Sequence, residues 1–308
     1  MDFLSSIGSA IMWPLYQAVS WVLIAWHRLF DLIPNITDGW AWTGAIVGLT
    51  LTIRALLIPL FVKQIKASRN MQLIQPQIKE LQKKYGHDRE KLAQEQMKLW
   101  SETGTNPFSS CLPILVQMPI FIALFRVLDQ AARGVALGAL SLADAQSVAQ
   151  ASIFGAPIAA TFINSEEAIV KVMTMTLVLI MSATTFLTQR QLMTQNMPAE
   201  ALTGQYAQQQ KILLYVLPVA FAFGGFFFPL GVLIYWTTSN FWTMGQQLYV
   251  IRRNPAPGTP AFAAKQERDR AAGKVVVEDP LAKPPSEPAP RQQPKRQPRS
   301  KRGKKGSK

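Results

Sequence analysis

The chain has 308 residues, of which 49% are hydrophobic and 16% charged, and its formal net charge is +14. This composition is too apolar and too segmented for one soluble domain, and it indicates a polytopic membrane protein with basic ends. One cysteine, Cys111, and two histidines exclude an intrachain disulfide framework and supply no cysteine–histidine metal cluster.

Residues 14–33 form the first apolar stretch, which polar residues interrupt. These polar residues share one stripe of a helix: Gln17, Ser20, Arg28 and Asp31. A helix of this kind, flanked by tryptophans, is typical of one that lies in the membrane interface. We therefore predict an extracytoplasmic, amphipathic interfacial helix within an N-terminal region of residues 1–39. An additional transmembrane helix is the alternative.

Residues 43–62 are the first secure membrane span, since a bilayer is crossed by roughly 20 mostly apolar residues. Arg54 lies well inside this stretch, where insertion scales give a cost of about 2.5–3.5 kcal/mol. Snorkelling toward the cytoplasmic headgroups is one solution, but eight residues separate Arg54 from Val62, which is about 12 Å of helix. We predict instead that Arg54 faces a bundle interior or a water-filled cavity.

A cytoplasmic helical hairpin is predicted for residues 67–105. In both halves apolar residues recur at three- and four-residue spacing, which is the pattern of a helix packed along one face. Gly86 and His87 break the pattern, and Asp88 is the candidate N-cap of the second helix. Pro76 is expected to kink the first helix.

Four further spans follow, and the chain then ends in a basic tail. The spans are predicted at residues 112–128, 169–188, 212–228 and 231–251. The fold class is therefore an all-α polytopic membrane protein, with a core of five transmembrane helices in residues 40–253. The Pro-, Lys- and Arg-rich residues 254–308 lack periodicity and are predicted to be disordered.

Basic residues set the predicted orientation. The stretch from Arg252 to Lys308 has 16 Lys and Arg against 5 acidic residues, and residues 63–107 have 9 against 5. The Gly/Ala-rich loop 129–168 is acidic, with four acidic residues and one basic residue. By the positive-inside tendency, the hairpin and the C-terminus are cytoplasmic.

Polar residues also run along the last span at every fourth position: Tyr235, Ser239, Thr243 and Gln247. Hydrogen bonding between helices explains residues such as Ser239 and Asn240. It does not explain Arg54, because no Asp or Glu lies in the five predicted spans. An unpaired cation needs water or polar groups around it, so we predict a hydrated cavity at Arg54. Its candidate neighbours are Thr50, Gln117 and Thr243.

The spans offer no catalytic constellation. Both histidines lie outside them, so an intramembrane serine protease would lack a histidine base, and neither paired carboxylates nor an HExxH helix is present. We therefore expect a non-enzymatic protein without a metal or another cofactor.

Three ordered blocks of the sequence resemble the YidC family of membrane protein insertases. They read TIRALLIPLFVKQIKASRNMQLIQPQIKELQKKYGHDREKLAQEQMKLW, NPFSSCLPILVQMPIFIALF and PLGVLIYWTTSNFWTMGQQ. The resemblance covers about residues 14–252 and is greatest to the five-span type of Gram-positive bacteria. It implies a groove in the inner leaflet, open to cytoplasm and lipid, with Arg54 as the essential positive residue. It also implies that Gln117 and Thr243 lie in the groove, and that substrate helices slide along the aromatic pair of Tyr235 and Trp236.

The predicted function is that of a membrane protein insertase and chaperone in a bacterial cytoplasmic membrane. Its predicted partners are nascent membrane proteins, the ribosome through the basic tail and the hairpin, a Sec-type translocon and anionic lipid. Two alternatives remain. A small-solute or anion transporter would use Arg54 as its binding cation, although the spans show no internal repeat. A ribosome- or RNA-tethering anchor would have the tail as its active part.

Overall fold

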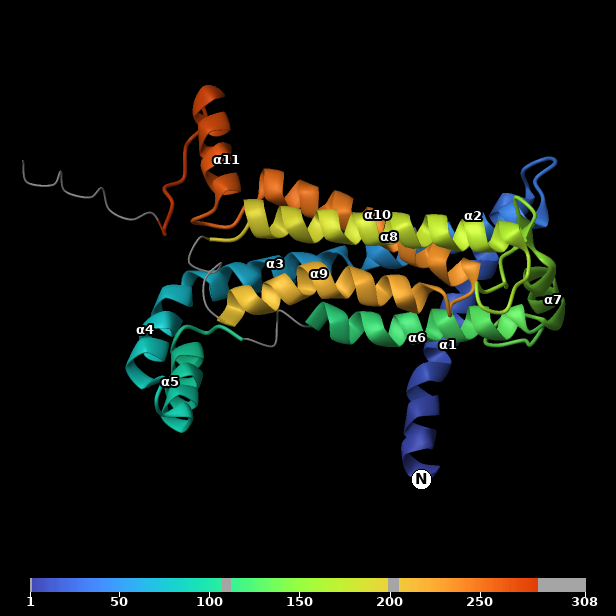
Figure 1. The fold of residues 1–308 in the computed structure, drawn as a ribbon, viewed down its shortest axis with the longest axis horizontal. Coiled ribbons are helices and arrows are strands. Elements are labelled where there is room, and N and C mark those ends of the chain that lie inside the picture. Colours follow the sequence, from blue (N-terminus) through green and yellow to red (C-terminus); the bar gives the residue numbers. More distant parts are fainter. Residues whose placement is uncertain (1, 107–111, 199–204, 282–308) are drawn as a thin grey trace, which may run out of the picture.

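The computed structural model describes residues 2–106, 112–198 and 205–281, and these residues are almost entirely helical. Figure 1 shows the long helices side by side in an elongated bundle, with the helical hairpin at one end and the short elements around α7 at the other. This arrangement agrees with the predicted all-α class.

Helix α1 (Asp2–Asp31) begins before the predicted residue 14, and its N-terminal part projects away from the bundle (Figure 1). Its C-terminal half packs against α2 and α6. Ser20, assigned to the polar stripe, is buried there: its hydroxyl donates to the Tyr16 carbonyl at 2.6 Å and accepts the Ala139 N–H at 2.7 Å. The stripe is therefore partly interior, and the interfacial position of α1 stays a prediction.

The predicted first span, residues 43–62, is not one continuous helix. It is divided at Leu57 into α2 (Asp38–Leu56) and α3 (Ile58–Leu73), and the axis of Ile58–Ala67 is bent by 48° from that of α2. Pro59 explains the break, because proline has no N–H to donate to the carbonyl four residues back and its ring collides with that carbonyl. Helix α3 then runs on into the hairpin.

The hairpin consists of α4 (Gln75–Tyr85) and α5 (Arg89–Glu102). The chain breaks at Ile74, and Pro76 stands at the start of α4, where a missing N–H does no harm. Asp88 caps α5 as predicted, with its Oδ1 accepting the Lys91 N–H at 3.0 Å. The packing of α4 on α5 and the Asp88 N-cap are confirmed. The kink predicted at Pro76 is wrong, because the helix ends before it and Pro76 stands in the first turn of a new helix.

The remaining long helices cover the other four predicted spans, except that α9 ends at Gly225 whereas the predicted span runs to residue 228. They are α6 (Leu112–Ala132), α8 (Ala168–Gln195), α9 (Gln205–Gly225) and α10 (Leu230–Arg253). Within the described ranges, α6 and α8 are each long and apolar enough to cross a membrane, and the bent α2–α3 pair is a third candidate. The apolar part of α9 is shorter, and polar residues line α10. The count of five spans therefore stays a prediction.

The acidic loop between α6 and α8 is more ordered than its composition indicates. It contains α7 (Leu142–Gln150) and an antiparallel pair of two-residue strands, β1 (Ser152–Ile153) and β2 (Ala156–Pro157). Ser141 and Asp144 form a reciprocal capping box at the start of α7. Gly138 has φ +67°, and a Cβ there would lie 2.4 Å from Ser20 Oγ, so only glycine fits this contact with α1.

The prediction of disorder from residue 254 onward is wrong for residues 254–281, which contain α11 (Pro260–Ala271). Composition indicated disorder, but specific polar contacts hold this segment. Thr259 caps α11, and Asn196 Oδ1 accepts the Ala256 N–H at 2.8 Å. Asp279 accepts the Gly258 N–H on both carboxylate oxygens. The rest of the predicted tail, residues 282–308, lies outside the described residues.

Candidate functional site

Arg54 lies in the last turn of α2, three residues before the break at Leu57. Its guanidinium donates a hydrogen bond to the hydroxyl of Ser239 on α10. Among the described residues, no carboxylate oxygen lies within 4.0 Å of Arg54. The positive charge is thus held by a neutral partner, and the C-terminal end of a helix is electrostatically favourable for it.

A second polar contact joins the same helix to α6. Gln117 Nε2 donates to the hydroxyl of Tyr235, one turn before Ser239 on α10, at 2.9 Å. Tyr235 is buried, so its hydroxyl obtains a protein partner in place of water. Helix α10 therefore offers polar groups to both α2 and α6 from one face.

Arg54 and Gln117 line one small cavity of about 40 Å³. Its other lining residues are Leu57, Leu60, Phe61 and Gln246. A cavity of this size has room for at least one water molecule, and Arg54, Gln117 and Gln246 supply polar groups to it. The cavity shares Phe61 and Gln246 with a larger cleft of about 520 Å³ between α3 and α10. That cleft is mostly apolar, and Lys66 and Asn254 are among its polar lining residues.

The two predicted threonine neighbours of Arg54 are engaged with their own helices. Thr50 is fully buried, and its hydroxyl donates to the Ile46 carbonyl at 2.7 Å. The hydroxyl of Thr243 donates to the Ser239 carbonyl at 2.9 Å. Neither residue is among those that line the small cavity. Their assignment to a groove stays a prediction.

Trp236 packs in an aromatic cluster instead of lining the small cavity. Its ring centroid lies 5.5 Å from that of Phe121, 4.7 Å from Phe221 and 5.7 Å from Phe228. These rings come from α6, α9 and the turn before α10. Phe121 also lies 6.2 Å from the Tyr235 ring, so the two adjacent aromatic residues share this neighbour, while Trp236 additionally contacts Phe221 and Phe228.

Sequence reasoning identified Ser239 only as a helix-packing residue and did not pair it with Arg54. Ser239 is four residues after Tyr235, which places it on the face of α10 that meets α2 and α6. Whether Ser239 reaches Arg54 depends on how α2 and α10 are aligned along their axes. The expectation of interhelical bonding is confirmed for Asn240, whose Nδ2 donates to Thr185 Oγ1 at 3.0 Å and to the Met181 carbonyl at 3.2 Å on α8.

Comparisons with known proteins give a consistent result. The family model described as 60Kd inner membrane protein matches residues 32–257. A Streptomyces avermitilis protein named membrane protein insertase YidC is 48% identical over 277 residues, which cover 87% of this chain and 64% of that protein. Proteins of the same name from Mycobacterium tuberculosis (strain H37Rv) and Tropheryma whipplei (strain Twist) are each 36% identical. The alignments cover 82% and 87% of this chain, and 80% and 90% of those proteins.

Proposed function

Because the chain belongs to the YidC family of membrane protein insertases, we propose that it inserts integral membrane proteins and helps them fold. The bacterial cytoplasmic membrane is its site of action. The observation that carries this proposal is Arg54, a cation in an apolar helix. Its guanidinium donates to the neutral hydroxyl of Ser239, and it lines a cavity beside a larger apolar cleft.

The mechanism is physical and involves no covalent step. No nearby carboxylate cancels the electric field of a cation that lacks such a partner. This field acts on other charges more strongly in a low-dielectric region than in water. Arg54 therefore attracts the acidic or polar end of an entering protein. Water at the cavity shortens the apolar distance that this end must cross. The apolar segment then moves sideways into lipid, where burial at about 25 cal/mol per Å² of apolar surface drives the process forward.

The proposed groove uses the residues named from the sequence. Arg54 supplies the charge, and Gln117 and Tyr235 link α6 to α10 beside it. Thr50 and Thr243 are proposed as further groove residues on α2 and α10. Their hydroxyls bond to their own helices and Thr50 is buried, so the groove has to open before Thr50 can meet a substrate. Trp236 joins Tyr235 as a contact for substrate helices. In this proposal five spans cross the membrane: the α2–α3 pair, α6, α8, α9 and α10. The hairpin and the C-terminus face the cytoplasm, and α1 lies at the outer interface.

The proposed partners are nascent membrane proteins, the ribosome, a Sec-type translocon and anionic lipid. The hairpin carries basic side chains, and two arginines close α10. Positive charge on the cytoplasmic face attracts both ribosomal RNA and anionic headgroups. Deleting residues 282–308 should lower ribosome binding and the efficiency of insertion, whereas a simple tether would lose its function.

Site-specific photocrosslinking tests the groove. A probe replaces Leu60, which lines the small cavity, and a control probe replaces Leu179 on α8, whose side chain is exposed. Ribosomes stalled on a short single-span membrane protein provide the substrate. Crosslinks from position 60, but not from position 179, should appear once the apolar segment has left the ribosome. Equal crosslinking at both positions, or none at position 60, would contradict a groove at Arg54.

The charge of Arg54 is tested separately. Arg54→Glu should abolish insertion, because it reverses the field in the cavity, and Arg54→Lys should retain part of it. Arg190→Glu on α8, where Arg190 is exposed, is the matched control and should insert like wild type. Insertion is measured as protease protection of a reporter in proteoliposomes. Wild-type activity of both Arg54 variants would contradict the proposal that the positive charge of Arg54 is needed for insertion.

A further inference from the structure

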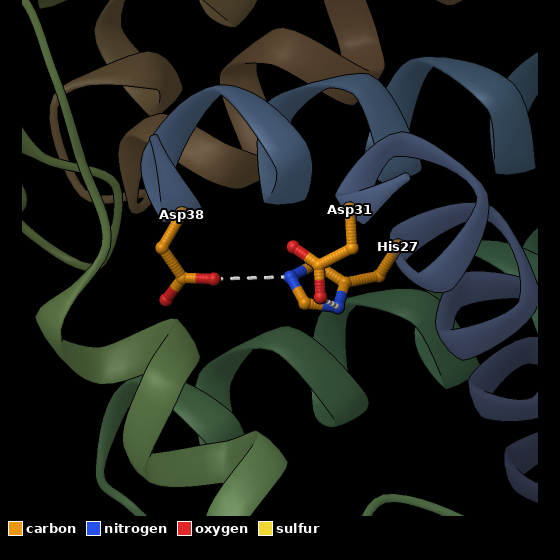
Figure 2. Close-up of side chains that lie close together, drawn as sticks. All are labelled: His27, Asp31 and Asp38. Carbon is orange, nitrogen blue, oxygen red and sulfur yellow. Dashed lines mark hydrogen bonds and ion pairs between the residues drawn. The ribbon is translucent and has the colours of Figure 1, made fainter. Parts of the chain in front are cut away.

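Three potential metal ligands meet where α1 turns into α2, as Figure 2 shows. His27 and Asp31 come from the last turns of α1, and Asp38 is the first residue of α2. His27 Nε2 lies 3.1 Å from Asp38 Oδ1, and His27 Nδ1 lies 4.0 Å from Asp31 Oδ2. One ligand atom from each residue lies within 4.8 Å of the others.

The spacing of these residues suits a divalent transition metal. His27 and Asp31 are four residues apart, so they share one helix face, as do the two histidines of an HExxH zinc helix. The third ligand comes from a separate helix, as in many zinc sites. Imidazole nitrogen and carboxylate oxygen bind Zn²⁺ at about 2.0–2.2 Å, so two such ligands lie about 3–3.5 Å apart. The His27–Asp38 distance already meets this condition, and rotation of the exposed Asp31 side chain brings in the third ligand.

Surrounding contacts hold two of the ligands in place. Asp38 Oδ2 accepts a hydrogen bond from Ser147 Oγ on α7 at 2.5 Å, and Ser147 Oγ accepts one from Trp42 Nε1 at 2.7 Å. The His27 ring stacks on Trp42, with 3.8 Å between ring centroids and 20° between planes. Hydrogen bonds to ligating carboxylates and fixed imidazole orientations are the usual supports of protein metal sites.

Charge and access also favour a cation. Two carboxylates face one imidazole, so the cluster has a net negative charge whether the imidazole is neutral or protonated. The His27 side chain is 11% exposed, whereas those of Asp31 and Asp38 are 57% and 48% exposed. The imidazole is therefore fixed in the protein while both carboxylates reach water. An ion at this place has a coordination position open to a water molecule.

We propose that His27, Asp31 and Asp38 bind a divalent transition-metal ion of the Zn²⁺ type, which joins α1 to α2 at the end of α2 remote from Arg54. The sequence predicted no metal site, because one cysteine and two histidines form no cluster and the predicted spans contain neither paired carboxylates nor an HExxH helix. Two carboxylates and one histidine become a ligand set only when the turn after α1 brings Asp38 back to His27. This inference does not depend on the proposed insertase activity.

Isothermal titration of Zn²⁺ into the full-length protein tests the site, after removal of any affinity tag and treatment with a chelator. One ion per chain should bind. Asp31→Asn and Asp38→Asn should each weaken binding at least tenfold, and Ser147→Ala, which acts through Asp38, should weaken it about 10–100-fold. Asp129→Asn is the control, because Asp129 pairs with Arg133 outside the cluster, and it should bind like wild type.

Thermal unfolding of the same variants separates metal binding from folding. Zn²⁺ should raise the melting temperature of wild type and Asp129→Asn but not that of Asp31→Asn. Within the part of the chain that the structure describes, the polar contact of the Asp31 side chain is the 4.0 Å approach to His27, so this variant should fold normally. Absence of binding in wild type, or equal binding by wild type, Asp31→Asn and Asp38→Asn, would overturn the proposal and leave a simple His–Asp ion pair.

Discussion

Replacing Ser239 with alanine removes the group that accepts the hydrogen bond of Arg54 while leaving the positive charge in place. Ser239 is 3% exposed, so water is poorly placed to substitute for its hydroxyl. A hydrogen bond to a charged group contributes about 1.5–3 kcal/mol net. We expect Ser239→Ala to lower the free energy of unfolding by this amount, which is roughly a tenfold to 150-fold change in the folded-to-unfolded ratio.

A double-mutant cycle isolates the contact from other effects of the alanine. In an Arg54→Gln background the serine can bond only a neutral group, so Ser239→Ala should cost about 0.5–1.5 kcal/mol. From the middle of the two ranges, the expected coupling energy between positions 54 and 239 is about 1 kcal/mol. Ser182→Ala is the control, because Ser182 bridges α8 and α9 through the Pro218 carbonyl at 3.5 Å without a charge. Its effect should add to that of Arg54→Gln within about 0.5 kcal/mol.

Reversible unfolding in mixed micelles gives the free energies, and proteoliposome insertion gives the activity. Ser239→Ala should insert substrate far better than Arg54→Glu, because the charge remains. A coupling energy below 0.5 kcal/mol would refute the assignment of Ser239 as the partner that holds Arg54. Loss of insertion in a well-folded Ser239→Ala variant would refute the view that charge, and not its hydrogen bond, attracts the substrate.

Two other contacts give predictions that thermal unfolding of the purified protein can check. Gly48→Val should destabilise the protein by about 1–3 kcal/mol, because a Cβ at Gly48 would lie 2.4 Å from the Trp26 ring. Gly245→Ala is the control, since a Cβ there would meet no described atom within 4 Å, and it should leave the free energy of unfolding unchanged. Equal effects of the two would contradict close packing of α1 on α2. Tyr235→Phe leaves Gln117 without its hydroxyl partner on α10, and should cost about 1–3 kcal/mol; an unchanged melting temperature would show that the amide finds another partner.

The helices could be predicted because hydrophobic periodicity and length are local properties of the sequence. The same reasoning expected Pro76 to kink the first helix of the hairpin, whereas the chain breaks at Ile74 and Pro76 begins a new helix. It missed the break at Leu57, because hydropathy gives the length of the apolar stretch 43–62 but does not show whether its helix is continuous. Pro59 was visible in that stretch, and its effect on the carbonyl four residues earlier would have predicted the bend.

Contacts between distant elements could not be predicted from one sequence. Spacing places Ser239 on the face of Tyr235, but its pairing with Arg54 depends on the axial alignment of α2 and α10. The metal ligands present the same difficulty, since Asp38 approaches His27 only after the chain reverses. Composition also failed for α11, because a few specific bonds, such as that from the Ala256 N–H to Asn196, order a segment whose residue content is typical of disorder.

The break at Leu57 and the unpaired charge at Arg54 are parts of one arrangement. A buried Arg costs about 2.5–3.5 kcal/mol on insertion scales, and a carboxylate partner would be the simplest compensation. Such a partner would also neutralise the field that the proposed mechanism needs. Ending α2 just after Arg54 places the cation at the negative end of the helix dipole, which contributes up to about 2 kcal/mol in partly buried sites. The bond to Ser239 adds a neutral acceptor. Together these two terms are comparable with the cost, so the fold can retain a positive charge inside the bundle without cancelling it.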